Sequence, residues 1–363
     1  MIVFGTRPEA IKLAPMVAAL RAQLGRNAIK VVCSGQHRSL LAQTMHALDF
    51  TADVNFDLMV HHQTPAEVLR RIVSALDRFL RDHKVDWLLV QGDTATALAG
   101  AVAGYLCGVP TVHLEAGLRT HDLEAPWPEE GFRQLISRLA SLHLAPTQNA
   151  RANLLAENVP EDRIVVVGNT GYDIQKHTSE TMQNMASETP YFLVTLHRRE
   201  NIGAPLKDVC RRLEVLLDRY PDHHILWPRH PNPEVIEIIE DCFGSEPKRL
   251  KLVDSMDYPV FLQAMAGASV VITDSGGVQE EAASFGVPIA VVRDKTERQE
   301  IVDLGLAGIA GSDGRDLGIL VDRFMKQPID QAAIRAWREM QGDGDAAQRA
   351  TDAILQRFPL PGS

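Results

Sequence analysis

Residues 273–281, Thr-Asp-Ser-Gly-Gly-Val-Gln-Glu-Glu, combine a predicted strand end, a turn of small residues and the start of a helix. A Ser-Gly-Gly turn lets backbone N–H groups approach a phosphate closely, and the N-terminus of the next helix favours negative charge. Glu280 and Glu281 stand one turn into that helix, where a carboxylate could hold the ribose of a nucleotide. A basic turn, Gly5–Glu9, lies far upstream. Together the two turns predict a site that holds a nucleotide diphosphate from two sides.

Polar side chains also follow the predicted strands of the first half of the chain. Arg7, Asp93 and Glu115 each come directly after a short apolar run, and ligands of open α/β sheets bind beyond the carboxyl ends of the strands. Glu115 has no helix cap to explain it, so we interpret it as functional, whereas Asp93 could equally cap a helix. Glu129 stands at a predicted helix start, where an acidic residue stabilises the helix dipole in any case.

The second half of the chain repeats this pattern of polar groups after strands. If the two halves form domains that face each other, all of these groups line one cleft between them. The groups are His197–Glu200 after strand 191–195, Arg229–His230 after 225–227, and Asp274–Ser275 after 269–273.

Short apolar runs alternate with longer amphipathic stretches along almost the whole chain. The runs are rich in Val, Ile and Leu, as expected of strands covered by helices on both faces, and their alternation with helices predicts parallel sheets. We predict two doubly wound α/β domains, residues 1–170 and 171–345, and a C-terminal helix within 346–363 that packs back on the first domain. The predicted strands are 2–4, 30–34, 87–90, 111–114, 142–145, 164–167, 191–195, 225–227, 250–253, 269–273 and 289–292.

The first helix illustrates how local chemistry determines an element. Thr6 and Glu9 fit a capping box, and Gly25 is a suitable stop. No Gly-x-Gly-x-x-Gly follows any predicted strand, so the chain lacks the dinucleotide fingerprint and an NAD enzyme is disfavoured.

Composition narrows the class of protein further. The 363 residues carry 37 Lys and Arg against 47 Asp and Glu, a net charge of −10, and only 6% are aromatic, which argues against nucleic acid as a partner. The four cysteines are dispersed without metal-ligand spacing, so we expect no metal site and reduced thiols in the cytoplasm. No apolar run approaches the length of a membrane span or a signal-peptide core, so we expect no membrane association.

With these motifs in place, the chain resembles the non-hydrolysing UDP-N-acetylglucosamine 2-epimerases of bacteria. The matching motifs follow the family's order and cover nearly the whole sequence. They are Gly5–Lys12, Gln36–Arg38, Gly92–Thr94, Glu115–Thr120, Pro126–Glu130, Gly168–Thr170, His197–Asn201, the segment 273–281, and Thr296–Arg298.

The resemblance implies a GT-B type α/β fold, in which two Rossmann-like doubly wound domains face each other across a cleft, usually in a homodimer. It implies reversible interconversion of UDP-GlcNAc and UDP-ManNAc without a cofactor. Members of the family eliminate UDP across C1–C2 to give 2-acetamidoglucal and then add it back, because the C2 proton is not acidic enough for direct exchange. That chemistry needs stabilisation of a departing diphosphate and carboxylates on either side of the sugar.

The resemblance also assigns roles to individual residues. Asp93, Glu115 and Glu129 resemble the catalytic carboxylates, with the choice of proton acceptor left open, and His197 stands with them. Glu281 resembles the ribose ligand, Phe261 part of the uracil pocket, and Arg298 a further nucleotide contact. Arg133, one turn past Glu129, is expected to reach the substrate as well. The residues that resemble the diphosphate cradle are Arg7, Lys12, His197, Ser275, Gly276 and Gly277.

Many bacterial relatives are activated by UDP-GlcNAc at a second site. Gln36, Arg198 and His230, together with Glu129, match residues associated with it. Ser39 replaces a longer polar residue, and His62 lies in a shortened segment where an arginine is common, which predicts weakened or absent activation. The side chains of Leu196, Lys295 and Gln299 also depart from the family pattern near the expected sugar site.

Three alternatives compete with this interpretation. A hydrolysing 2-epimerase would release free N-acetylmannosamine, but that branch lacks the turn that is intact at Arg7–Lys12. A glycosyltransferase of the same architecture would need an acceptor pocket, which no motif marks. A non-catalytic UDP-sugar sensor has no use for several carboxylates around the sugar.

Overall fold

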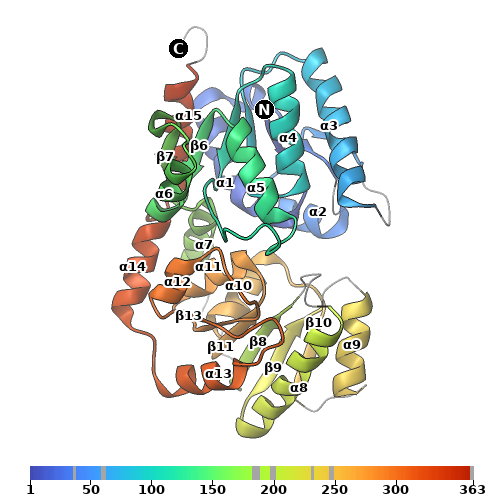
Figure 1. Cartoon of the computed structure of the whole chain (residues 1–363), viewed down its shortest axis with the longest axis vertical. Coiled ribbons are helices and arrows are strands. Elements are labelled where there is room, and N and C mark those ends of the chain that lie inside the picture. Colours follow the sequence, from blue (N-terminus) through green and yellow to red (C-terminus); the bar gives the residue numbers. More distant parts are fainter. Residues whose placement is uncertain are drawn as a thin grey trace. The chain divides into compact units, whose positions relative to one another are not determined.

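The computed structural model describes residues 1–35, 38–58, 63–181, 189–196, 202–229, 233–244 and 249–359. The chain divides into two compact units, Met1–His177 with Met340–Ser363, and Thr178–Glu339 (Figure 1). Helix α7 (Thr170–Thr181) leads out of the first unit, and α14 (Gln331–Gln341) returns to it. The sequence placed these boundaries at 170/171 and 345/346.

In the described residues, the first unit contains a parallel seven-stranded sheet in the order β3-β2-β1-β4-β5-β6-β7. The chain reverses its direction across the sheet between β1 and β4, which makes this pair the topological switch point where ligands of such folds bind. The strands are β1 (Ile2–Phe4), β2 (Val31–Cys33), β3 (Val54–Asn55), β4 (Leu88–Gln91), β5 (Thr111–Leu114), β6 (Leu142–Ala145) and β7 (Ile164–Val166).

Helices cover both faces of this sheet. Alternate side chains of β1 point to opposite faces and join different buried clusters. Ile2 and Phe4 join one buried cluster with side chains of α1 and α15, whereas Val3 joins another with side chains of α3, α4 and α5. The latter three helices lie side by side in Figure 1. The helices of this unit include α1 (Arg7–Leu24), α2 (Arg38–Ala47), α3 (Pro65–Asp82), α4 (Ala95–Leu106), α5 (Glu129–Leu139), α6 (Gln148–Ala156) and α15 (Ala346–Arg357), with 3-10 turns η1 (Arg26–Ala28) and η2 (Glu161–Arg163).

The second unit repeats the architecture with a parallel sheet in the order β10-β9-β8-β11-β12-β13 over its described residues. Its switch point lies between β8 and β11. The strands are β8 (Tyr191–Thr195), β9 (His224–Pro228), β10 (Leu250–Val253), β11 (Val270–Thr273), β12 (Ile289–Val291) and β13 (Ala307–Ile309). The helices include α8 (Ala204–Arg219), α9 (Pro233–Phe243), α10 (Tyr258–Ala266), α11 (Gly276–Phe285), α12 (Gln299–Asp303) and α13 (Leu317–Lys326).

These sheets confirm the predicted class of two Rossmann-like α/β domains. Each predicted strand is present with small differences at its ends, and the predicted Thr6–Glu9 capping box and the Gly25 stop of α1 are both found. Two strands were missed. β3 has only two residues, neither of them buried, and β13 is the small-residue run Ala-Gly-Ile, so neither shows an apolar strand pattern.

The C-terminal helix is part of the first unit. Ala347, Ala350 and Ile354 of α15 are buried in the same cluster as the apolar side chains of α1. Among the described residues, no helix has both the length and the apolar composition needed to cross a membrane.

We expect Ile354→Ala to destabilise the first unit by about 2 to 5 kcal/mol, because Ile354 is fully buried and its truncation leaves a cavity between α15 and α1. Chemical denaturation followed by circular dichroism would measure the loss. Gln356→Ala, at an exposed position of the same helix, is the control and should leave the unfolding midpoint unchanged. Equal midpoints for the two variants would contradict the packing described for α15.

Candidate functional site

A buried carboxylate, that of Glu9, organises the turn after β1. Its Oε2 accepts hydrogen bonds from the backbone N–H groups of Gly5 (2.9 Å) and Thr6 (2.7 Å), and its Oε1 accepts one from the Thr94 hydroxyl (2.7 Å). Burial raises the pKa of Glu9 to about 7, although these hydrogen bonds oppose the shift. Arg7, the basic residue of this turn, is half-buried at the first position of α1.

Glu115 follows β5 and is held by one group from helix α1 and one from the neighbouring strand β4. The Lys12 ammonium lies 2.5 Å from its Oε1, and the side-chain amide of Gln91, the last residue of β4, donates to its Oε2. Its backbone is in the left-handed region, with φ of 64°, a conformation that costs a residue with a Cβ and is concentrated at functional sites. The predicted role of Lys12 in the diphosphate cradle stays a prediction, because here its ammonium binds a carboxylate.

Asp93 follows β4 and faces an arginine from α5. Arg133 donates to Asp93 Oδ2 through Nε (3.2 Å) and Nη2, and to Glu130 Oε2 through Nη1 (3.0 Å). Glu130 is completely buried and also accepts the backbone N–H groups of Thr120 (3.1 Å) and His121 (3.3 Å). Glu130 therefore fixes the position of the Arg133 guanidinium, which binds Asp93. The anchoring by Glu130 was missed by the sequence interpretation.

Glu129 is the first residue of α5 and is half-buried. It stands four positions before Arg133 on the same helix, so both side chains lie on one helix face. The sequence prediction that Arg133 lies one turn past Glu129 is confirmed. The exposed Trp127 precedes this helix.

Two buried histidines lie beneath the loops of the first unit. His113 of β5 pairs with His143 of β6 in the parallel ladder, and its Nε2–H donates to the Gly92 carbonyl at 2.8 Å. Burial lowers the pKa of His113 to about 3 and that of His143 to about 4, so both rings are neutral. A neutral His113 holds the turn that carries Asp93. The sequence showed only that a histidine occupies an apolar strand.

In the second unit, α11 begins with the Ser-Gly-Gly turn directly after β11. Ser275 is the N-cap residue, and its N–H donates to Thr273 Oγ1 at 3.0 Å. A Cβ on Gly276 would lie 2.5 Å from the Arg298 guanidinium, whereas a Cβ on Gly277 would meet no atom within 4 Å. The packing of Arg298 therefore requires glycine at 276, whereas the space beside 277 is open.

Arg298 is buried at the base of this turn in a network of ion pairs. Its Nε donates to Glu280 Oε1 at 2.8 Å, its Nη1 binds Glu297, and Glu297 also accepts from Arg293 at 2.8 Å. Only 7% of Arg298 is exposed. The described geometry thus shows Arg298 supporting the α11 turn, and its direct contact with a nucleotide stays a prediction.

The remaining predicted nucleotide ligands of the second unit lie on α10 and α11. Glu281 Oε1 accepts the hydroxyl of Tyr258 at 2.8 Å, and Phe261 is half-buried against the core between β11 and α11. The departures from the family pattern are also placed: Leu196 is buried in the core, whereas Lys295 and Gln299 are exposed. His197, Gln36, Arg198 and His230, with His62, lie outside the described residues, as does the side chain of Ser39.

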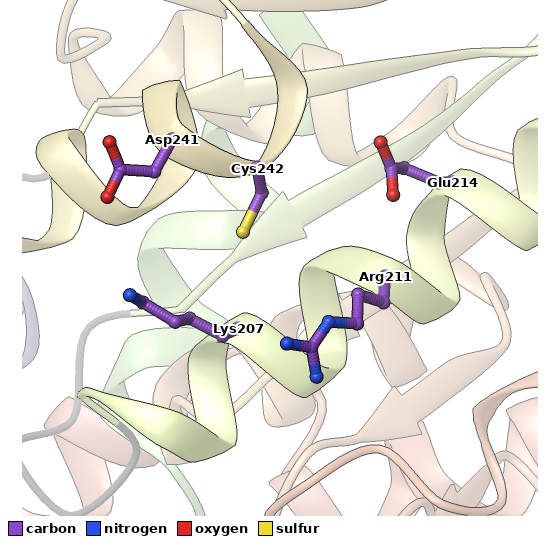
Figure 2. A pocket seen from close by; sticks show the side chains of 5 residues that line it. All are labelled: Lys207, Arg211, Glu214, Asp241 and Cys242. Atoms are coloured by element: carbon purple, nitrogen blue, oxygen red, sulfur yellow. The ribbon is translucent and has the colours of Figure 1, made fainter.

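Two surface pockets formed by described residues lie away from these groups. One of about 320 Å³ lies between α8 and α9 and is lined by Lys207 and Arg211 of α8 and by Asp241 and Cys242 of α9 (Figure 2). Another, of about 500 Å³, borders α3 and is lined by Phe56, Arg71 and Arg78. Neither contains a predicted site residue. Over the described residues, no cluster of three or more His, Cys, Asp or Glu could hold a metal ion.

The fold and the polar turns after its strands define the class of this protein. It is an α/β protein with two Rossmann-like units, and each unit has polar groups at its switch point, as in nucleotide-binding enzymes. The family model for UDP-N-acetylglucosamine 2-epimerase matches residues 21–355. The chain is 39% identical to the UDP-N-acetylglucosamine 2-epimerase of Yersinia pestis, covering 98% of this chain and 97% of the relative, and 37% identical to that of Bacillus subtilis, covering 99% and 95%. The chain therefore belongs to the UDP-N-acetylglucosamine 2-epimerase family, which confirms the resemblance seen in its motifs.

Solved structures agree with this family. The chain is similar to the UDP-GlcNAc 2-epimerase of Neisseria meningitidis bound to UDP-GlcNAc, with a TM-score of 0.89, 34% identity and coverage of 98% and 99% of the two chains. It is also similar to the Methanocaldococcus jannaschii enzyme in complex with UDP-GlcNAc and UDP, with a TM-score of 0.89, 30% identity and coverage of 98% and 99%. A glycosyltransferase structure aligns with a TM-score of 0.64 at 15% identity, which shows that the fold alone does not separate the two activities.

The buried histidines predict how the stability of the first unit depends on pH. The folded protein keeps His113 neutral down to a pKa of about 3, whereas the unfolded chain takes up a proton near 6.5. The unfolded state therefore binds more protons in this window, and the contribution of His113 to stability is lost as the pH falls from 6.5, by at most about 1.4 kcal/mol per pH unit.

We expect His113→Asn to flatten the fall in the free energy of unfolding between pH 6.5 and 4, although the variant is less stable at neutral pH. Urea unfolding at a series of pH values would show this. His46→Gln, at an exposed position of α2, is the matched control and should keep the wild-type slope. An unchanged slope in the His113 variant would show that this ring does not stay neutral in the folded protein.

Proposed function

We propose that this protein is a non-hydrolysing UDP-GlcNAc 2-epimerase, which interconverts UDP-GlcNAc and UDP-ManNAc. The observation that carries the proposal is the pair of carboxylates after adjacent strands of the first sheet, each held against a cation. Glu115 is bound by Lys12, and Asp93 is bound by Arg133. Acid–base chemistry on one carbon needs carboxylates of this kind in fixed positions.

The reaction begins with elimination. One base removes the proton from C2, the electron pair forms the C1–C2 double bond, and the C1–O bond to UDP breaks, giving 2-acetamidoglucal and UDP. Re-addition of UDP at C1, with a proton delivered to C2 from the other face, gives the epimer. The overall change is an isomerisation that consumes no oxidant or reductant, so we propose that it needs no cofactor.

Asp93, Glu115 and Glu129 are the proposed acid and base groups, with His197 beside them. Lys12 forms an ion pair with Glu115, and Arg133 forms one with Asp93, so each of these carboxylates is held in place beside a cation. A charged carboxylate is the state that can accept the C2 proton. Which of the three accepts it is not assigned.

The second unit is the proposed UDP-binding unit. The N-terminus of α11, with Ser275, Gly276 and Gly277, would stabilise the diphosphate through backbone N–H groups and the helix dipole. Arg7, in the basic turn after β1, is a further proposed diphosphate ligand. Glu281 is the proposed ribose ligand, Phe261 the contact to uracil, and Arg298 the support of the turn and a further nucleotide contact.

We also propose that the enzyme acts in the cytoplasm as a homodimer. We propose further that Gln36, Arg198 and His230 belong to a second UDP-GlcNAc site, at which Ser39 and His62 leave activation weakened or absent. Support for the compartment comes from the four cysteines, all of which are free. Support for the dimer comes from the family resemblance.

We expect Asp93→Asn and Glu115→Gln each to lower turnover of UDP-GlcNAc by at least about a hundredfold while UDP binding is retained, because each change removes a proton acceptor without changing the volume of the side chain. Turnover would be measured from the UDP-ManNAc formed, and UDP affinity by calorimetry. Asp82→Asn, at an exposed end of α3, is the control with normal turnover. Near-normal turnover in either site variant would remove that residue from the mechanism.

The same assay separates the alternatives. A wild-type protein that releases free N-acetylmannosamine and UDP would belong to the hydrolysing branch. A protein that binds UDP-GlcNAc and leaves both epimers unchanged would be a sensor or a glycosyltransferase, and the proposal would then fail.

A further inference from the structure

At the switch point of the first sheet, two adjacent turns diverge. The turn after β1 leads to α1 on one face, and the turn after β4 leads to α4 on the other, as the separate buried clusters of these helices show. The ladder between the two strands pairs Ile2 with Leu89, near their amino ends. The backbone after Phe4 and after Gln91 must therefore be joined by side chains if the two turns are to keep a fixed separation.

Glu9 and Thr94 provide such a link. Glu9 Oε2 accepts the N–H groups of the β1 turn, and its Oε1 accepts the Thr94 hydroxyl at 2.7 Å. Thr94 is the N-cap of α4, and its oxygen accepts the N–H of Ala97 at 3.0 Å. The hydroxyl has a single proton, which it gives to Glu9. One chain of hydrogen bonds thus runs from the first turn of α1 to the first turn of α4.

The two turns carry residues of the proposed reaction. Arg7 follows Thr6 in the chain, and Asp93 precedes Thr94. Glu9 itself is only 1% exposed. It is therefore too deeply buried to act on a substrate.

We propose that the Glu9–Thr94 hydrogen bond is a positioning device, which fixes Asp93 relative to the basic turn at Arg7. The inference rests on the proposed function for its catalytic consequence, while the link itself is testable without activity. Glu9 and Thr94 act through Asp93 and the β1 turn. They are positioning residues for the reaction.

The decisive variant is Thr94→Val, which removes the hydroxyl and keeps the shape of the side chain. We expect kcat for UDP-GlcNAc to fall by at least about tenfold with KM within about threefold, because a displaced Asp93 affects the chemical step more than nucleotide binding. Thr94→Ser restores the hydroxyl and should bring kcat back to within about twofold of the wild type.

Thr94→Val also removes a helix cap, so a matched control is needed. Thr147 caps α6 at the same edge of the sheet and accepts the N–H of Ala150 at 3.1 Å. Thr147→Val should lower the melting temperature by a similar amount and leave kcat unchanged. A fall of kcat in both variants would assign the effect to general destabilisation and overturn the inference.

A second measurement is independent of activity. Because the Gly5 and Thr6 amides donate to Glu9, freeing that carboxylate from Thr94 should loosen them, and their hydrogen exchange should become at least about tenfold faster in Thr94→Val but not in Thr147→Val. Unchanged exchange would overturn the link even if the wild type proved inactive on UDP-GlcNAc. An active wild type with normal kcat in Thr94→Val would refute the positioning role alone.

Discussion

A parallel sheet gathers the carboxyl ends of all its strands at one edge, and the site of this protein depends on that constraint. At the switch point the neighbouring connections leave toward opposite faces, which opens space for a ligand and removes the backbone contacts that would hold the turns together. In the first unit the separation is bridged by a buried carboxylate. Glu9 binds two amides of one turn and the hydroxyl that caps the helix of the next.

The polar side chains of the neighbouring turns are held by contacts of their own. Glu115 is set by Lys12 and Gln91, Asp93 by Arg133, and Arg133 in turn by Glu130. Burial of a carboxylate without a cation costs several kcal/mol, and the ion pair to Arg133 with the backbone donors of Thr120 and His121 offsets that cost for Glu130. Fold and site therefore depend on the same contacts.

Most of the fold could be predicted from the sequence, because buried parallel strands are short runs of Val, Ile and Leu and their helices carry capping signals. The strands that escaped, β3 and β13, bury too little apolar surface to show such a run. The site could be predicted only in part. The sequence singled out Asp93 and Glu115 at strand ends and Arg133 on the helix after Glu129, whereas the contacts of Glu130 and His113 are visible only in the folded chain. Glu9 was recognised as half of a capping box, but its bond to Thr94, 85 positions away, requires the tertiary fold.

The most direct test of the central claim is proton NMR of the purified protein with UDP-GlcNAc in deuterated water. The account predicts that UDP-ManNAc appears and that deuterium enters at C2 of both epimers, because elimination and re-addition exchange that proton with solvent. Appearance of UDP-ManNAc with the C2 proton fully retained would contradict a solvent-exchanging carboxylate. A spectrum that stays unchanged, even after a trace of UDP-ManNAc is added, would contradict the epimerase assignment itself.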